Sequence, residues 1–241
     1  MKIIKTLHEW PLSNVELVEI DGKRFVLKTI HSDFANEVKK QKLLSKKCRT
    51  IKIPKIYWVK KSKGKVSFLM DYIGSKKKVN SKTALKIIKK FHKETKKVKS
   101  NLFKTYNFEA FYGDFLEVKK YLGDFGKQTK AQLKVDFSEI FNSDYSIVHG
   151  DWGKDQILGK NGEYIVDFGK SFYGPSILDY ANFFLNDNKQ NDKKLIKAKI
   201  VVAIITLRWL ELCRIKYIKY NYKKEIHHYV CIINNSLKSL G

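Results

Sequence analysis

The sequence predicts an α+β fold with two lobes: a small antiparallel β-rich N-terminal lobe that contains one helix, and a larger, mainly helical C-terminal lobe. Short runs of β-branched and apolar residues fill the first third of the chain, whereas roughly the last sixty residues carry helical apolar spacing. The periodicity changes after "YIGSKKK", residues 72–78. We therefore expect residues 1–73 to form the first lobe and residues 74–241 the second.

The predicted N-terminal lobe has the element order strand, strand, helix, strand, strand. Residues 14–20 and 24–30 are strand candidates, and "DGK" between them is a hairpin signal. Residues 33–47 have the apolar spacing of a helix. Two further strands are expected in 53–61 and 65–73, separated by the turn residues "SKGK".

The C-terminal lobe is expected to alternate helices with short strands. Residues 81–97 carry apolar side chains at helical spacing, and Ser81 is the predicted N-cap. Residues 108–125 are predicted to be helical with breaks at their glycines. The strand-like pieces "YSIVHGD", "QILGK" and "EYIVDFG" follow, and the remainder is predicted to be helical.

The chain is strongly basic, with 49 Lys and Arg against 24 Asp and Glu, a formal net charge of +25. The positive electrostatic field of such a chain attracts polyanions: nucleotides, nucleic acid or anionic membranes. The lysines are spread along the whole chain, which favours their interpretation as solvated side chains. The sequence also lacks an RNA-binding aromatic signature and a helix-turn-helix pattern, so a nucleic acid partner is not favoured.

The cysteines and apolar stretches indicate a soluble, cytoplasmic protein. Cys48, Cys213 and Cys231 are far apart and form no CxxC pair, so neither a zinc site nor a disulfide framework is indicated. The N-terminus lacks the apolar run of a signal peptide. The stretch Ile200 to Leu207 is far shorter than the roughly 20 residues that a membrane-spanning helix needs, so no membrane span is expected.

Candidate chemistry is concentrated in "IVHGDWGKDQIL", residues 147–158, and in "YIVDFG", residues 164–169. Asp151 follows a His-Gly turn, and Asp167 ends an apolar run, so we expect both carboxylates at the rim of one cleft. Gln156 can add a neutral oxygen, and such a pair of oxygens suits Mg²⁺. The other carboxylate could accept a proton from an alcohol.

The segments "HGDWGKDQIL", "YIVDFG" and "GPSILDYA" together resemble the aminoglycoside phosphotransferase and choline kinase-like family of the protein-kinase-like superfamily. The resemblance implies a protein-kinase-like two-lobed fold with ATP and Mg²⁺ as cofactors. It implies that Asp151 is the catalytic carboxylate that orients or deprotonates the acceptor hydroxyl, and that Asp167 binds the metal together with Gln156. His149 and Asp179 would support the catalytic loop.

The resemblance extends over about residues 10 to 185. It implies that Lys28 contacts the α- and β-phosphates and that Glu37 pairs with this lysine. Asp71 and Tyr72 fall in the segment whose backbone would receive adenine. Ser13 falls in the loop that would cover the phosphates, where it and its neighbour Asn14 could supply a turn and donors. The expectation common to these assignments is that Lys28, Asp151 and Asp167 meet at one cleft.

Two departures from the family pattern affect the predicted chemistry. Gln156 stands where the family has Asn, so the amide has a longer stem and a less fixed geometry. The predicted phosphate-covering segment, Pro11 to Leu17, has no glycine, although glycine lets backbone N–H groups approach phosphates closely.

Each of these residues also has a structural interpretation. Asp151 could form an ordinary Asx turn, Gln156 could be a surface amide, and Lys28 and Glu37 could be solvated charges. His92 and His149 are expected to be packed histidines rather than catalysts.

The leading functional hypothesis is an ATP-dependent phosphotransferase that acts on a hydroxyl of a small molecule. The alternatives are a small atypical Ser/Thr protein kinase linked to tRNA or ribosome assembly, and a catalytically weak nucleotide-binding pseudokinase. The single candidate acidic patch for a polycationic acceptor is Glu109, Asp114 and Glu117. Because the chain is so basic, we expect a neutral or anionic acceptor, such as a sugar or phosphosugar.

Overall fold

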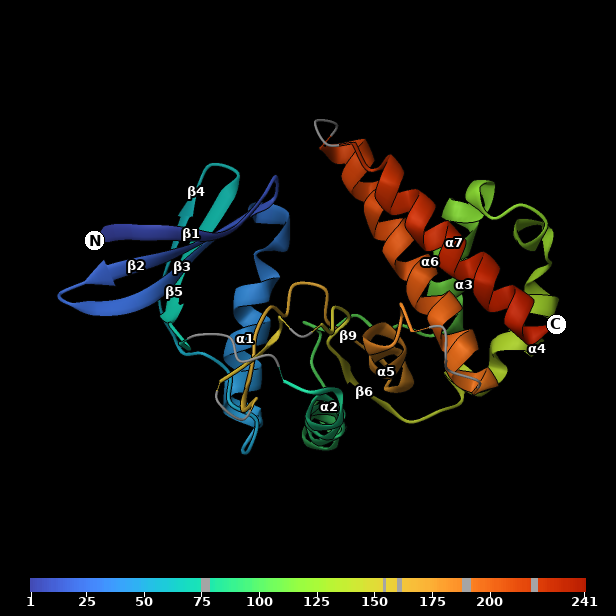
Figure 1. Ribbon diagram of the computed structural model, residues 1–241, viewed down its shortest axis with the longest axis horizontal. Helices are drawn as coiled ribbons and strands as arrows, with labels where there is room; N and C mark the ends of the chain where they lie inside the picture. Colours follow the sequence, from blue (N-terminus) through green and yellow to red (C-terminus); the bar gives the residue numbers. More distant parts are fainter. Residues whose placement is uncertain (75–78, 154, 160–161, 188–191, 218–220) are drawn as a thin grey trace. The chain divides into compact units, whose positions relative to one another are not determined.

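The computed structural model describes residues 1–74, 79–153, 155–159, 162–187, 192–217 and 221–241. It divides into two compact units: Met1–Leu102 with Gly153–Ser171, and Phe103–Trp152 with Phe172–Gly241 (Figure 1). The first unit contains an antiparallel sheet and the second is mainly helical, so the predicted fold class is confirmed. The predicted lobe boundary after Ile73 stays a prediction.

The first unit is built on a five-stranded antiparallel sheet with the strand order β1-β2-β3-β5-β4 (Figure 1). The strands are β1 (Lys2–Trp10), β2 (Ser13–Ile20), β3 (Lys23–His31), β4 (Ile56–Ser62) and β5 (Lys65–Asp71). The predicted hairpin between β2 and β3 is confirmed: Asp21 and Gly22 have φ angles of 49° and 70°, as a tight two-residue hairpin turn requires.

The N-terminal strand β1 was not predicted from the sequence. Its residues are exposed except for the half-buried Trp10, because β1 is an edge strand that pairs only with β2. A strand with no buried face carries no alternation of apolar and polar residues.

One face of the sheet packs against α1 (Asn36–Lys47), which follows the short 3₁₀ helix η1 (Ser32–Phe34). Val38 of α1 shares an apolar cluster with Val26 and Ile30 of β3 and Phe68 of β5. The predicted order of strand, strand, helix, strand, strand is therefore present after β1.

The first unit also contains α2 (Ser81–Thr95) and the small hairpin of β7 (Ile157–Leu158) and β8 (Tyr164–Ile165). The prediction that Ser81 caps α2 is wrong by one residue. Asn80 is the N-cap, and its side chain accepts the backbone N–H of Thr83. Of the strand predicted from "QILGK", Lys160 lies outside the described residues.

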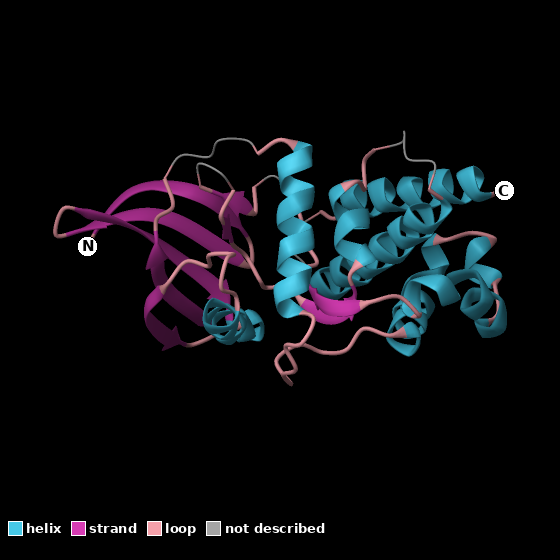
Figure 2. Cartoon of the chain, turned by 90° about the horizontal axis from the view of Figure 1, so that it is seen from below, coloured by secondary structure: helices cyan, strands magenta, loops and turns pink. Residues whose placement is uncertain are grey.

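The second unit packs its helices around an aromatic-rich core in which Phe111, Phe115 and Phe137 are almost fully buried. Figure 2 shows the helices of this unit with its two-stranded sheet. Its elements are α3 (Phe108–Val118), η2 (Lys119–Tyr121), η3 (Phe125–Lys127), α4 (Lys130–Phe141), β6 (Tyr145–Val148), β9 (Phe172–Pro175), α5 (Ile177–Phe183), α6 (Lys193–Lys216) and α7 (Lys223–Leu240).

The predicted helical break at Gly113 is wrong, because α3 continues through this residue. The break near Gly123 is present, and this glycine has a φ of 54° between η2 and η3. Packing of α3 against α6 and α4 outweighs the weak helix propensity of one glycine. Within the described parts of the chain, no helix is both long and apolar enough to cross a bilayer.

Candidate functional site

The first unit holds a cluster of three charged side chains, of which two are buried and the third, Asp167, is partly exposed. Lys28 on β3 places its ammonium 2.7 Å from Glu37 Oε1 on α1 and 3.0 Å from Asp167 Oδ1, just after β8. Lys28 is only 5% exposed and Glu37 only 4%. The structure therefore brings together three residues that the sequence singled out, from three separate elements of the same unit.

The two carboxylates keep Lys28 charged despite its burial. Burial by itself would lower the pKa of Lys28, but the negative charges of Glu37 and Asp167 and their hydrogen bonds raise it above its ordinary value. Burial raises the pKa of Glu37, and the nearby Lys28 opposes this shift. Burying an ammonium and carboxylates costs solvation free energy unless the charges compensate one another. Removal of any one of the three side chains should therefore destabilise the other two.

Asp167 has an unusual backbone conformation for a residue other than glycine, with a φ of 70°. Asp tolerates this left-handed region better than most residues, but holding it there requires support from the surrounding structure. The next residue, Phe168, is fully buried and lies 6.2 Å from the ring of Phe91 on α2. This anchor fixes the chain directly after the Asp167 carboxylate, which remains 44% exposed.

Lys40 also positions this segment, and sequence reasoning missed it. Its ammonium donates to the backbone carbonyls of Gly169, at 3.2 Å, and Ser171, at 2.6 Å. Lys40 lies one turn after Glu37 on α1 and is itself buried. The sequence did contain a signal for Lys40. Glu37 and Lys40 are three residues apart and therefore lie on the same helix face as the buried Gln41 and Leu44.

Gln156, the predicted second metal ligand, belongs to the same unit as Asp167. Its backbone carbonyl accepts the N–H of Val166, which directly precedes Asp167. Its side-chain oxygen lies so close to Gly153 that a Cβ atom at that glycine would approach it to 2.8 Å. Gly153 therefore leaves room for the longer Gln side chain at position 156.

The predicted phosphate-covering segment is the hairpin between β1 and β2. The turn consists of Pro11 and Leu12, whereas Ser13 and Asn14 already belong to β2, so the expected turn at Ser13 and Asn14 is wrong. Strand pairing places Val15 opposite Lys28 and Ser13 opposite Ile30. Because side chains alternate along a strand, Ser13 shares the sheet face of Lys28.

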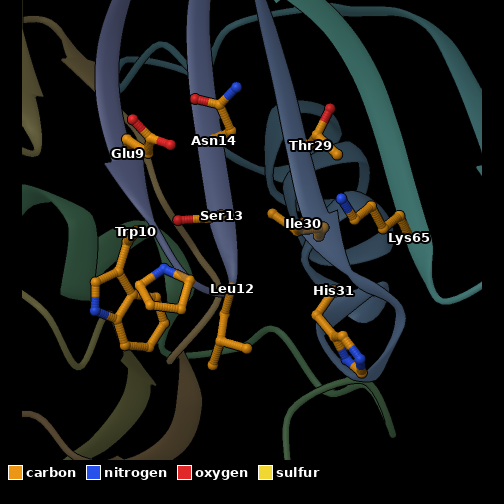
Figure 3. Close-up of a pocket in the computed structure, with 10 residues that line it drawn as sticks. Glu9, Trp10, Leu12, Ser13, Asn14, Thr29, Ile30, His31 and Lys65 are labelled. Atoms are coloured by element: carbon orange, nitrogen blue, oxygen red, sulfur yellow. The ribbon is translucent and has the colours of Figure 1, made fainter. Parts of the chain in front are cut away.

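Asn14 lies on the other face of the sheet, opposite Thr29. Both residues line a cavity of about 460 Å³, together with Glu9 and Lys65 (Figure 3). This cavity contains neither Lys28 nor Asp167 among its lining residues. Ser13 and Ile30 also line it, so the cavity reaches residues of the Lys28 face of the sheet without including Lys28 itself.

Asp71 and Tyr72, predicted near an adenine site, lie at the end of β5. The Asp71 carboxylate accepts the backbone N–H of Lys55 at 2.7 Å and the hydroxyl of Tyr57 at 2.6 Å. Its backbone N–H donates to the carbonyl of Lys55. Asp71 thus attaches β4 to the end of β5, and Tyr72 packs against the apolar cluster that contains Val26.

The second unit carries the His-Gly-Asp segment that follows β6. His149 is fully buried, and its ring lies 4.8 Å from that of Trp152. Gly150 has a φ of 79°, a conformation that glycine adopts without strain. Asp151 is half-buried directly after this turn.

Helix α5 holds the backbone of this segment through two side chains. The Asp179 carboxylate accepts the N–H groups of His149, at 2.8 Å, and Gly150, at 3.0 Å. Asn182, one turn later, donates from Nδ2 to the Gly150 carbonyl at 3.2 Å. Sequence reasoning identified Asp179 but missed Asn182, whose spacing of three residues from Asp179 was the available signal.

Asp179 is completely buried, which changes its acidity. Burial raises its pKa to about 7, against the opposing hydrogen bonds from the His149 and Gly150 N–H groups and from Trp152. Its role in this structure is therefore to support the main chain at Gly150.

The candidate acidic patch on α3 is largely neutralised by its neighbours. Asp114 accepts the Tyr106 hydroxyl at 3.0 Å, and the Arg208 guanidinium lies 3.9 Å from Asp114 and 3.8 Å from Glu117. Glu109 pairs with Lys130 at 2.7 Å. Burial raises the pKa of Asp114 to about 6, although Tyr106 and Arg208 oppose the shift.

The two strands that precede Asp151 and Asp167 belong to separate small sheets, β6 with β9 and β7 with β8. They also fall in different units, so a cleft common to Asp151, Lys28 and Asp167 stays a prediction.

Comparison with known proteins identifies the fold. No protein-family model matches the sequence, and no curated protein sequence matches it either. Among solved structures, aminoglycoside phosphotransferase APH(4)-Ia has a TM-score of 0.70 at 10% identity, over 98% of this chain and 93% of that one. A thermostable mutant of that enzyme, in a ternary complex with ADP and hygromycin B, gives the same values.

Two further structures have similar folds. A putative fructosamine-3-kinase from Haemophilus somnus 129PT has a TM-score of 0.62 at 17% identity, over 98% of this chain and 90% of that one. A putative aminoglycoside phosphotransferase from Ralstonia eutropha JMP134 has a TM-score of 0.64 at 8% identity, over 98% and 91%. The predicted resemblance is confirmed at the level of the fold.

Proposed function

We propose that the chain is an ATP-dependent phosphotransferase that transfers the γ-phosphate to a hydroxyl of a small molecule. The observation that carries the proposal is the contact of the buried Lys28 with both Glu37 and Asp167. A buried lysine held between carboxylates of a helix and of a post-strand turn is the arrangement that kinases use to bind phosphates and metal. The fold neighbour crystallised with ADP supports a nucleotide as the phosphate donor.

Lys28 would bind the α- and β-phosphates, and Glu37 would orient its ammonium toward them. Ser13 would face the phosphates, because it shares the sheet face of Lys28. The backbone of Tyr72 would receive the adenine, while Asp71 keeps the end of β5 attached to β4.

Asp167 and Gln156 would hold Mg²⁺, which supplies charge compensation for the phosphates when it is bound. The residues fit this ion, because the Asp167 carboxylate remains 44% exposed beyond its contact with Lys28. Among the described residues, no group of three or more His, Cys, Asp and Glu side chains could hold a metal ion. One carboxylate and one amide suffice for Mg²⁺, because this ion keeps several waters and binds substrate phosphates directly.

Asp151 would act on the acceptor. In the transfer step, the acceptor oxygen forms a bond to the γ-phosphorus as the bond from this phosphorus to the β–γ bridging oxygen breaks. The proton of the hydroxyl passes to the Asp151 carboxylate, and ADP leaves. Asp179 and Asn182 would serve as positioning residues, because they hold the backbone of Gly150 beside Asp151.

The acceptor is proposed to be neutral or anionic, such as a sugar or phosphosugar. A polycation would require an excess of carboxylates, but Asp114 and Glu117 lie near Arg208, and Glu109 pairs with Lys130. The net charge of +25 also opposes a polycation.

The test is a transfer assay with γ-labelled ATP and a panel of sugars, sugar phosphates, amino sugars and other small alcohols. Asp151→Asn should lower transfer by roughly 10²- to 10⁴-fold, since it removes the proton acceptor, while nucleotide binding is retained. Asp155→Asn, an exposed carboxylate four residues away, is the matched control and should leave transfer unchanged.

Two outcomes reject the proposal. Labelling of proteins but of no small alcohol would favour the protein kinase alternative. Nucleotide binding without any acceptor whose labelling depends on Asp151 would favour an inactive nucleotide-binding module.

A further inference from the structure

Helix α2 presents a face composed almost entirely of lysine. The helix has six exposed residues, the first of which is Ser81. The other five are all lysines: Lys82, Lys86, Lys89, Lys90 and Lys93. The opposite face is buried, and Ala84, Ile88 and Phe91 are completely inaccessible (helix side-on in Figure 2).

The lysine spacing forms a straight stripe along the helix. From Lys82 the intervals are four, three, one and three residues, which keeps all five side chains on one side of an α-helix. Lys97, four residues after Lys93, continues the same series just beyond the helix. At about 1.5 Å per residue, the stripe from Lys82 to Lys97 is roughly 22 Å long.

In the part of the chain that the structure describes, no carboxylate neutralises this stripe. Among the described residues, none of the five lysines lies within ion-pair distance of a carboxylate. The one acidic residue of α2, Glu94, accepts the backbone N–H groups of Arg49 and Thr50. That contact brings the basic C-terminal end of α1, with Lys46 and Lys47, close to the C-terminal end of α2.

The lysine face of α2 differs from the exposed side of α4. Helix α4 of the same chain exposes a mixture of charged, polar and apolar residues. Lys134, Val135, Asp136 and Glu139 all lie on its exposed side. The exposed side of α4 is thus mixed in sign, whereas the exposed charges of α2 are all positive, as are those of α1.

We propose that the lysine face of α2 docks the protein on an anionic lipid surface. Each ammonium is a compact charge on a flexible stem, so a line of them can meet many mobile headgroups at once without a fitted pocket. A nucleic acid is less favoured, because the exposed positions of α2 include no arginine to read bases and no aromatic ring to stack on them. This inference goes beyond the proposed phosphotransferase activity and does not depend on it.

The experiment measures binding of the full chain to vesicles by co-sedimentation. The vesicles contain phosphatidylcholine alone or phosphatidylcholine mixed with phosphatidylglycerol. The stripe variant replaces Lys82, Lys86, Lys89 and Lys93 by Gln, which removes four charges and retains helix propensity. The control variant replaces Lys134, Lys223, Lys224 and Lys238 by Gln, four exposed lysines of the second unit. Both variants have the same net charge, and circular dichroism checks that both are folded.

The wild type should bind the anionic vesicles and not phosphatidylcholine alone. The stripe variant, which lacks four of these lysines, should bind them more weakly by roughly 600-fold, since each lysine near such a surface strengthens binding about fivefold. The control variant should remain within a few-fold of the wild type.

Three results would overturn the proposal. The wild type could fail to bind anionic vesicles, or the two variants could lose binding equally, which would indicate only a response to net charge. Tighter binding of a duplex RNA or DNA, lost in the stripe variant alone, would assign this face to nucleic acid instead.

Discussion

The Lys28 ammonium lies 3.0 Å from Asp167 Oδ1, although the two residues are 139 positions apart in the chain. The contact joins the centre of the five-stranded sheet to the turn that follows β8. Because Glu37 holds the same ammonium from α1, three elements of the first unit depend on one side chain.

Lys40 should stabilise the segment that follows Asp167. Lys40→Met removes the donor to the carbonyls of Gly169 and Ser171 and leaves them without this partner in a buried setting. The free energy of unfolding, measured with urea, should fall by about 1–3 kcal/mol. Lys39→Met changes the adjacent, exposed lysine and should have little effect. Equal effects of the two substitutions would contradict the role given to Lys40.

Asp179→Asn should destabilise the protein and alter its pH dependence. An Asn oxygen can accept only one of the two N–H groups of His149 and Gly150, and its NH₂ group faces the other, at a cost of about 1–3 kcal/mol.

The pKa of Asp179 is about 7 in the folded state and near 3.8 when unfolded. The folded state therefore binds the extra proton between these values, and the contribution of Asp179 to stability falls as pH rises from about 4 to about 7. Urea unfolding at pH 5, 6 and 7 should show the difference between wild type and Asp179→Asn shrinking with pH. Asp136→Asn, an exposed carboxylate on α4, is the control. A difference that stays constant or grows with pH would refute the assignment.

Gly150→Ala should destabilise the His-Gly-Asp turn, because a Cβ atom is strained at a φ of 79°. We expect a loss of about 1–2 kcal/mol in unfolding free energy. Gly113→Ala is the matched control, since Gly113 lies inside α3 and a Cβ atom added there would meet no neighbouring atom within 4 Å. This control should stabilise the protein by about 0.5–1 kcal/mol, so the two substitutions are expected to have opposite signs.

Gln156→Asn should strengthen the response to Mg²⁺ if position 156 supplies a metal ligand. The shorter stem loses less rotamer freedom when it binds, so half-maximal transfer should need several-fold less Mg²⁺. Gln156→Ala removes the oxygen and should need more. The titration of activity against Mg²⁺ distinguishes the three proteins, and an Ala variant identical to the wild type would remove Gln156 from the metal site.

The sequence predicted the fold class because its strongest signals are local. The hairpin at Asp21 and Gly22 and the apolar face of α2 depend on residues close together in the chain. Strand β1 escaped prediction because it is exposed on both faces, and β9 because only its pairing with β6 makes its four residues a strand.

The same distinction between local signals and long-range contacts applies to the site residues. Asp151, Asp167 and Lys28 were found because each lies in a short motif. Lys40 and Asn182 were missed because their partners are backbone carbonyls of other segments, and a carbonyl has no signature in the sequence. The neutralisation of Asp114 by Arg208, almost a hundred positions away, also required the folded chain.

The most direct test of the central claim is calorimetric binding of ATP in the presence of Mg²⁺. If the Lys28 cluster is a nucleotide site, the wild type binds one ATP, and Lys28→Met lowers the affinity at least about tenfold by removing the phosphate contact. Lys28→Arg retains the positive charge between Glu37 and Asp167, so it serves as a second variant in case Lys28→Met fails to fold. It should also bind ATP more weakly than the wild type, because the planar guanidinium differs in shape from an ammonium. Lys23→Met, at the exposed start of the same strand, should bind like the wild type. Absence of ATP binding by the wild type, or equal affinity in folded Lys28 and Lys23 variants, would contradict the account.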